Sequence, residues 1–169
     1  LGCSAAIRGT LEHYVKAVEI DGFGPKVMGQ LLASGMVKDP ADLYALAAMD
    51  LVNLERMGDT LARKLVANIG ARRAMPLAVF LRALGMDEVG KTVASVLSEH
   101  FHTLAALRTT SADAMVTIDG IGPAIAASVV RGLRDRATLI DRLLADPRIS
   151  SETAGALDWW RRNGSRVDV

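Results

Sequence analysis

The sequence is poor in cysteine and in aromatic residues. Cys3 is its single cysteine, and only 4% of its 169 residues are aromatic. One thiol cannot build an internal disulfide framework, so we expect a reducing, cytoplasmic location. The apolar runs are too short to cross a bilayer and no signal-peptide pattern is present, so we expect no membrane partner. Because the chain begins with Leu1 in place of Met, we expect a fragment of a longer protein.

The composition predicts an all-α fold. Half of the residues are hydrophobic, and Ala, Leu and Val dominate among them. The sequence contains no strong run of alternating β-branched residues of the kind that forms a sheet. A chain of this length has room for one large domain or two small ones, each with its own core.

The charge is unevenly distributed along the chain, although the net charge is only +1 at pH 7. Residues 39–55 contain four acids and no Lys or Arg, whereas residues 56–91 contain seven bases and three acids. The second segment indicates a basic face, and a solvated surface of mixed charge is the alternative.

The most informative segment is residues 117–126, Thr-Ile-Asp-Gly-Ile-Gly-Pro-Ala-Ile-Ala. It predicts the end of one helix, a tight turn and the start of another. Gly120 suits a backbone position with positive φ, and Ile121 is the apolar plug of the turn. Gly122 leaves the backbone bare, and Pro123 fits the first position of the next helix. The free N–H groups of that helix then form a site for a phosphate.

Variants of this segment recur along the chain at a nearly constant spacing. Its second glycine has counterparts at Gly24, Gly58 and Gly90, which gives intervals of 34, 32 and 32 residues. A small residue follows four positions later in three of the four repeats, where it allows two helices to approach closely; these residues are Ala62, Ala94 and Ala126, with Met28 in the first repeat. The second and third repeats lack the first glycine. Arg56 takes its place in the second repeat, so that turn must be looser or strained.

A period near 33 residues is also typical of tetratricopeptide and ankyrin arrays. The signatures of those repeats are missing, and a glycine at every turn favours helix-hairpin-helix units. Hairpins that contact phosphate are favoured over purely structural turns. No Gly-Lys-Ser/Thr ends these turns as in a P-loop, and no Gly-x-Ser-x-Gly elbow presents a nucleophile. His100 and His102 have no partners at metal-ligand spacing.

Local signals predict further helices around the hairpins. Residues 4–19 show helical spacing of apolar side chains, and Pro76 begins a helix that runs through Leu84. Asp39, Asp50 and Ser111 are predicted N-caps, and the helices of the last two run through Leu54 and Val116. Residues 139–144 form an amphipathic stretch, the chain breaks at residues 146–147, and a last helix contains Trp159 and Trp160.

Several segments in register resemble bacterial NAD-dependent DNA ligases over about residues 3–145. The segments that carry the resemblance are residues 11–15 (Leu-Glu-His-Tyr-Val), 20–24 (Ile-Asp-Gly-Phe-Gly), 40–44 (Pro-Ala-Asp-Leu-Tyr), 54–58 (Leu-Glu-Arg-Met-Gly), 80–85 (Phe-Leu-Arg-Ala-Leu-Gly) and 88–90 (Glu-Val-Gly). The region resembled is the helix-hairpin-helix domain, in which four tandem hairpins form two pseudo-symmetric pairs that grip duplex DNA around a nick. The family also tolerates an arginine at the place of Arg56.

The resemblance implies a division of the chain into four parts. Residues 1–19 would be the end of a zinc module and a lead-in helix, and residues 20–74 the first hairpin pair. Residues 75–145 would be the second pair, and residues 146–169 a C-terminal helix and the start of a linker. Cys3 resembles the last of four zinc ligands, so it would bind metal only together with upstream cysteines.

The sequence therefore predicts a non-catalytic, sequence-independent DNA-binding module with nicked double-stranded DNA and the rest of a ligase chain as partners. The chain has no Lys-x-Asp-Gly motif, so NAD, Mg²⁺ and structural Zn²⁺ would belong to the parent protein and not to this fragment. The alternatives are a helical protein-interaction module, or the hairpin domain of a nuclease or branch-migration protein. The predicted DNA-binding residues are Gly22, Phe23, Gly24, Lys26, Arg56, Gly58, Lys64, Val89, Gly90, Lys91, Thr92, Gly120, Ile121, Gly122 and Arg131.

Overall fold

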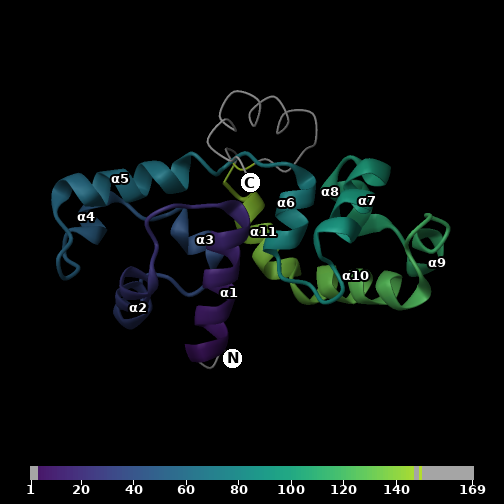
Figure 1. The fold of residues 1–169 in the computed structure, drawn as a ribbon, viewed down its shortest axis with the longest axis horizontal. Helices are drawn as coiled ribbons and strands as arrows, with labels where there is room; N and C mark the ends of the chain where they lie inside the picture. The colour runs from purple at the N-terminus through teal and green to yellow at the C-terminus, as the bar shows by residue number, and fades with distance from the viewer. Residues whose placement is uncertain (1–3, 147–148, 150–169) are drawn as a thin grey trace. The chain divides into compact units, whose positions relative to one another are not determined.

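The computed structural model describes residues 4–146 and residue 149 (Figure 1). Every regular element in these residues is a helix, so the all-α prediction is confirmed for the part of the chain that the structure describes. None of the described helices is long and apolar enough to cross a membrane.

The chain divides into two compact units, residues 1–73 and residues 74–169. The helices of the first unit are α1 (Ser4–Val18), α2 (Pro25–Ser34), α3 (Pro40–Leu43), α4 (Ala48–Leu51) and α5 (Asp59–Gly70). The described helices of the second unit are α6 (Leu77–Ala83), α7 (Lys91–Phe101), α8 (Leu104–Thr109), α9 (Ala112–Met115), α10 (Pro123–Asp135) and α11 (Ala137–Leu144).

Among the described helices, four of the packed pairs of consecutive helices contain the repeated segments of the sequence. In the first unit α1 packs on α2 and α4 packs on α5, and in the second unit α6 packs on α7 and α9 on α10. Each unit has its own apolar core. Leu11, Leu31, Leu51 and Leu65 are fully or almost fully buried in the first unit, as are Phe80, Leu97, Val129 and Ile140 in the second. Burial of this apolar area, at roughly 25 cal/mol per Å², is the main stabilising term of such a fold.

Two of the three predicted N-caps are confirmed. Asp39 caps α3 and forms a capping box with Asp42, and the Ser111 hydroxyl accepts a hydrogen bond from the Ala114 N–H at the start of α9. Gly35 ends α2 in the left-handed conformation with φ of 75°. A left-handed C-terminal glycine satisfies the last carbonyls of a helix at little steric cost.

The prediction that Asp50 is an N-cap was wrong. Ala47 is the N-cap of α4, and Asp50 lies at the third helical position, where its carboxylate accepts from the Ala47 N–H at 2.9 Å. The helix ends at Leu51, short of the predicted Leu54. Helix α8 was not among the predicted helices, and Thr103 caps it through its hydroxyl at 3.2 Å from the Ala106 nitrogen. Cys3, Pro147, Trp159 and Trp160 lie outside the described residues.

Candidate nucleic-acid interface

Each of the four helix pairs is joined by a loop that ends in a glycine, and we call these the first to fourth hairpin loops. They are residues 19–24, 52–58, 84–90 and 116–122. The closing glycine is in each case the N-cap of the following helix, and its carbonyl accepts from the N–H four residues later at 2.9–3.0 Å; the glycines are Gly24, Gly58, Gly90 and Gly122. The repeated sequence pattern therefore corresponds to a repeated local structure.

The residue two positions before each closing glycine has a left-handed backbone. Its φ is 95° at Gly22, 59° at Arg56, 67° at Glu88 and 92° at Gly120. Of the two possibilities open for the second hairpin loop, a looser or a strained turn, the structure shows the strained one. A left-handed side-chain-bearing residue costs roughly 1–2 kcal/mol, which the rest of the fold has to offset in the second and third hairpin loops.

The next residue of each loop is an apolar plug. Phe23, Met57, Val89 and Ile121 are all buried. In the last three loops the plug's N–H donates to the carbonyl three residues earlier at 3.1–3.3 Å, as in a β-turn. Phe23, Val89 and Ile121 therefore have side chains that pack inward, and any contact that they make with a ligand must come from their backbone.

The described structure does not require glycine at the four closing positions. Their φ and ψ lie in the extended region, which any residue can adopt. Within the described part of the chain, a Cβ built on Gly24, Gly58, Gly90 or Gly122 would have no atom within 4 Å beyond those of the glycine and its two chain neighbours. Ser, Thr, Asp and Asn stabilise an N-cap by hydrogen bonds that glycine cannot make. Neither backbone conformation nor packing therefore explains why glycine occupies this position four times.

The residues predicted to bring the helices together are fully buried. Met28, Ala62, Ala94 and Ala126 each have 0% of their surface exposed. They lie four residues after the closing glycines, one turn into α2, α5, α7 and α10. A small side chain at this place lets the second helix of each hairpin lie close against the first, as the sequence analysis predicted, and Met28 fills the same place in the first hairpin.

The first turns of these helices carry different charges. Lys26 in α2 and Lys91 in α7 are exposed, and neither helix has an acid in its first turn. The first turn of α10 also lacks an acid. In α5, however, Asp59 is the first helical residue, and its carboxylate pairs with Arg63 at 3.1 Å. Asp59 already uses the positive end of the helix dipole, so the second hairpin is the least suited of the four to an anion.

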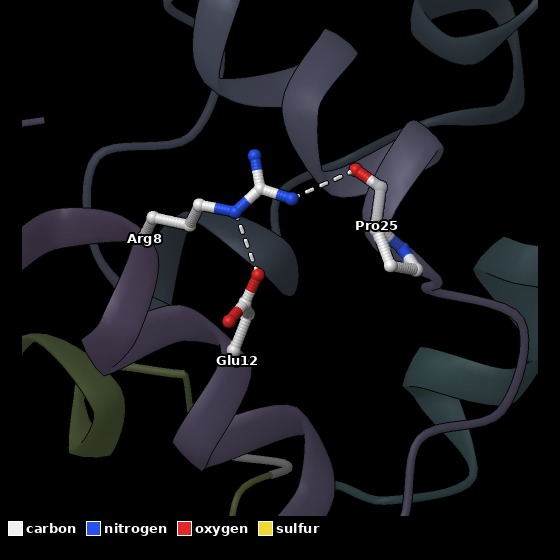
Figure 2. Close-up of polar contacts among 3 residues, drawn as sticks. All are labelled: Arg8, Glu12 and Pro25. Carbon is white, nitrogen blue, oxygen red and sulfur yellow. Dashed lines mark hydrogen bonds and ion pairs between the residues drawn. The ribbon is translucent and has the colours of Figure 1, made fainter. Parts of the chain in front are cut away.

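Arg8 adds a cation to the first hairpin that the sequence analysis missed. Figure 2 shows its side chain reaching from α1 to the first residue of α2, where it donates to the Pro25 carbonyl at 3.1 Å. Its Nε also donates to Glu12 at 2.7 Å, which holds the guanidinium in place. The i, i+4 spacing of Arg8 and Glu12 was the only signal in the sequence, and it does not reveal the contact with α2.

The other predicted side chains lie on the exposed surface at different distances from the loops. Thr92 is in the first turn of α7, and Lys64 is one turn further along its own helix, α5. Arg131 is exposed on α10 and donates to the Ser128 hydroxyl at 3.3 Å. With a rise of 1.5 Å per residue, Arg131 lies about 12 Å along the helix from Pro123. Arg131 is therefore separated from the start of α10 by more than two helical turns.

The fourth hairpin loop also forms a surface hollow. Residues 116–122 line an open concavity of about 450 Å³. Gly120 and Gly122 lie in its wall, where side chains would otherwise project, so the backbone is accessible from outside. Among the described residues, no group of three or more His, Cys, Asp and Glu side chains could hold a metal ion.

Comparison with known families agrees with this geometry. Residues 79–139, which contain the third and fourth hairpin loops, match the family model described as the helix-hairpin-helix motif. This part of the chain is thus a helix-hairpin-helix region. That the first two hairpins belong to the same motif, so that four occur in tandem, stays a prediction.

The chain as a whole is similar to DNA ligases, so the resemblance seen in the sequence is confirmed. It is 42% identical to the DNA ligase of Pelotomaculum thermopropionicum over 132 residues, which are 77% of this chain and 19% of that protein. Its alignment with the DNA ligase of Haloarcula marismortui has 42% identity over 170 aligned positions and covers 94% of this chain and 24% of that protein. The chain thus spans about a fifth to a quarter of the length of these curated relatives. The Haloarcula protein is archaeal, so the resemblance extends beyond bacterial ligases.

Proposed function

We propose that this chain is a sequence-independent duplex DNA-binding module of an NAD-dependent DNA ligase, and that it holds backbone phosphates around a nick. The observation that carries the proposal is the set of four closing glycines. They leave the first turns of α2, α5, α7 and α10 without a side-chain cap, and among the described residues only the glycine's own chain neighbours lie within 4 Å of a Cβ built there. A phosphate oxygen fits such a place, because uncapped N–H groups and the helix dipole both favour an anion.

The four hairpins would not contribute equally. Arg8 and Lys26 would support a phosphate at the first hairpin, and Lys91 one at the third. The fourth hairpin would rely on its bare backbone alone, while Asp59 would weaken the second by repulsion. These contacts reach the sugar–phosphate backbone and read no base, which suits a protein that must act at any nick.

Catalysis would belong to other parts of a longer protein. The chain holds no Lys-x-Asp-Gly motif, and its described residues hold no ligand cluster for Mg²⁺ or Zn²⁺. NAD, Mg²⁺ and structural Zn²⁺ are therefore assigned in this proposal to the remaining parts of the ligase. The module would contribute by holding the nicked ends in place, and positioning of this kind can lower a barrier by several kcal/mol.

A salt titration tests the proposal and separates it from a protein-interaction role. A fluorescein-labelled nicked duplex would be titrated with the chain at several salt concentrations, and a second duplex of unrelated sequence would serve as the control. We expect equal affinity for both duplexes. With about four to six phosphate contacts, log K should fall against log salt with a slope of roughly −4 to −5. Absence of binding, or binding that salt does not change, would refute the proposal.

A further inference from the structure

One hydrogen bond occurs at the same place in both units. In the first unit, Arg72 Nε donates to the Glu19 carbonyl at 3.1 Å. In the second unit, Arg136 donates to the Gly85 carbonyl from its terminal nitrogen at 2.8 Å, and to the Leu84 carbonyl from Nε at 2.6 Å. Both arginines are half-buried, and each bond joins residues more than 50 positions apart in the chain.

The two arginines are equivalent in the repeat. Arg72 follows Gly58 by fourteen residues, and Arg136 follows Gly122 by fourteen residues. Their acceptors are also equivalent, because Glu19 precedes Gly24 by five residues and Gly85 precedes Gly90 by five residues. Both acceptor residues have a left-handed backbone, with φ of 62° and 67°.

The chemistry of the acceptor suits an arginine. Glu19 follows the last residue of α1, and Leu84 and Gly85 follow the last residue of α6. The final carbonyls of a helix have no partner within the helix, and they lie at the negative end of its dipole. A guanidinium provides charge-assisted hydrogen bonds there, and its planar fork can bind two successive carbonyls, as it does in the second unit.

We propose that Arg72 and Arg136 are positioning residues that fix the distance between the two phosphate sites of each unit. Each arginine connects the end of the second hairpin's long helix to the start of the first hairpin loop of the same unit. The neighbouring contacts differ between the units. Asn68 donates to the Asp21 carbonyl at 3.0 Å in the first, whereas Met86 packs against Gly132 in the second. The arginine contact is common to both units. This inference rests on the proposed DNA-binding function.

The first test measures the spacing directly and needs no DNA. Spin labels would be placed at Lys91→Cys and Ala124→Cys, in the exposed first turns of α7 and α10, with Cys3→Ser to leave no other thiol. The distance distribution should be narrow in the parent, and should broaden or shift by several Å in Arg136→Lys and Arg136→Leu. A lower melting temperature with an unchanged distribution would show a merely structural role and overturn the inference.

The second test uses a labelled nicked duplex. Arg136→Leu and Arg136→Lys should both bind about tenfold more weakly, with a salt slope shallower by about 1–2, because one hairpin no longer reaches its phosphates. Lysine keeps the positive charge but lacks the planar guanidinium. If Arg136→Lys bound DNA as tightly as the parent, the charge alone would explain the effect, and the positioning role would be refuted. Arg134→Leu, which removes an exposed cation from the last turn of α10, should bind nearly as the parent does. If Arg134→Leu lost as much affinity as Arg136→Leu, the inference would also fail.

If the parent itself did not bind DNA, the proposed function would fail, and the distance measurement would still test the positioning role of Arg136.

Discussion

Glu88 and Gly120 occupy the same position of two hairpin loops and share a left-handed backbone. Their φ values are 67° and 92°, and each stands two residues before a closing glycine. The side chain of Glu88 is exposed. One loop thus meets this requirement with glycine at no steric cost, whereas the other tolerates the strain of a glutamate.

This difference predicts opposite effects of substitution at the two positions. Glu88→Gly should raise the free energy of unfolding by about 0.5–1 kcal/mol, because relief of strain outweighs the extra entropy of glycine in the unfolded chain. Gly120→Val should lower it by about 1–3 kcal/mol. Urea denaturation would measure both changes. Asp87→Gly is the matched control, since Asp87 carries the same charge as Glu88 but has no positive φ. An equal gain from Asp87→Gly would mean that removal of charge, and not of strain, is the cause.

A buried pair of tyrosines predicts the behaviour of the first unit at high pH. The hydroxyls of Tyr14 and Tyr44 lie 2.7 Å apart, and Tyr44 donates to the Arg72 carbonyl at 2.9 Å. Because the Tyr44 hydrogen is used in that bond, Tyr14 must be the donor to Tyr44. Burial, with the neighbouring Tyr44 as a second cause, raises the pKa of Tyr14 well above 10.

The sign of the pH effect follows from this raised pKa. Above pH 10 the unfolded chain loses the Tyr14 proton while the folded chain keeps it, so stability should fall as pH rises. Tyr14→Phe should lower the free energy of unfolding by about 0.5–1.5 kcal/mol at neutral pH. Its stability should also decline less steeply than that of the parent between pH 10 and 11. Thermal melts from pH 7 to 11 would compare the two proteins. Equally steep declines would show that Tyr14 is not the group responsible.

The chain alone should have no nucleotidyl-transfer activity. Because it contains no Lys-x-Asp-Gly motif, incubation with labelled NAD should leave no AMP on the protein, and nicked DNA should remain unsealed. Gel autoradiography and a nick-sealing assay would measure both. A full-length DNA ligase run in parallel would confirm that the assay works. A covalent AMP adduct on this chain would show that it carries a reactive lysine outside that motif.

Much of the fold could be predicted because its signals are local. The glycines at 120 and 122, the proline at 123 and the cap at Asp39 each act through neighbours within a few residues, and the structure confirms their places. Asp50 was misassigned because acids are favoured both at the N-cap and at the third helical position. Sequence alone cannot distinguish these two uses of a carboxylate when the preceding residues carry no other signal.

The contacts that link one hairpin to another could not be predicted. Arg8 reaches Pro25 across 17 residues, and Arg72 reaches Glu19 across 53. An arginine side chain carries no local feature that specifies so distant a partner. The repeat spacing was the one sequence signal for these contacts, since Arg72 and Arg136 follow the closing glycines Gly58 and Gly122 by the same number of residues. The positions of the left-handed Arg56 and Glu88 were likewise visible only by comparison with Gly22 and Gly120.

The central claim, that these hairpins hold phosphate on a bare backbone, is tested most directly at Gly122. Neither Gly122→Ala nor Gly122→Asp should harm folding, because a Cβ there meets no atom within 4 Å and the backbone is extended. Asp should even stabilise α10 as its N-cap, by accepting from the N–H groups that a phosphate would otherwise use. The decisive measurement is the affinity of the parent and both variants for a nicked duplex at one salt concentration, with thermal melts to show that all three are folded. The account predicts that Gly122→Asp loses about 1–3 kcal/mol of binding through repulsion and lost hydrogen bonds, and that Gly122→Ala loses much less. A folded Gly122→Asp variant that binds nicked DNA as tightly as the parent would contradict it.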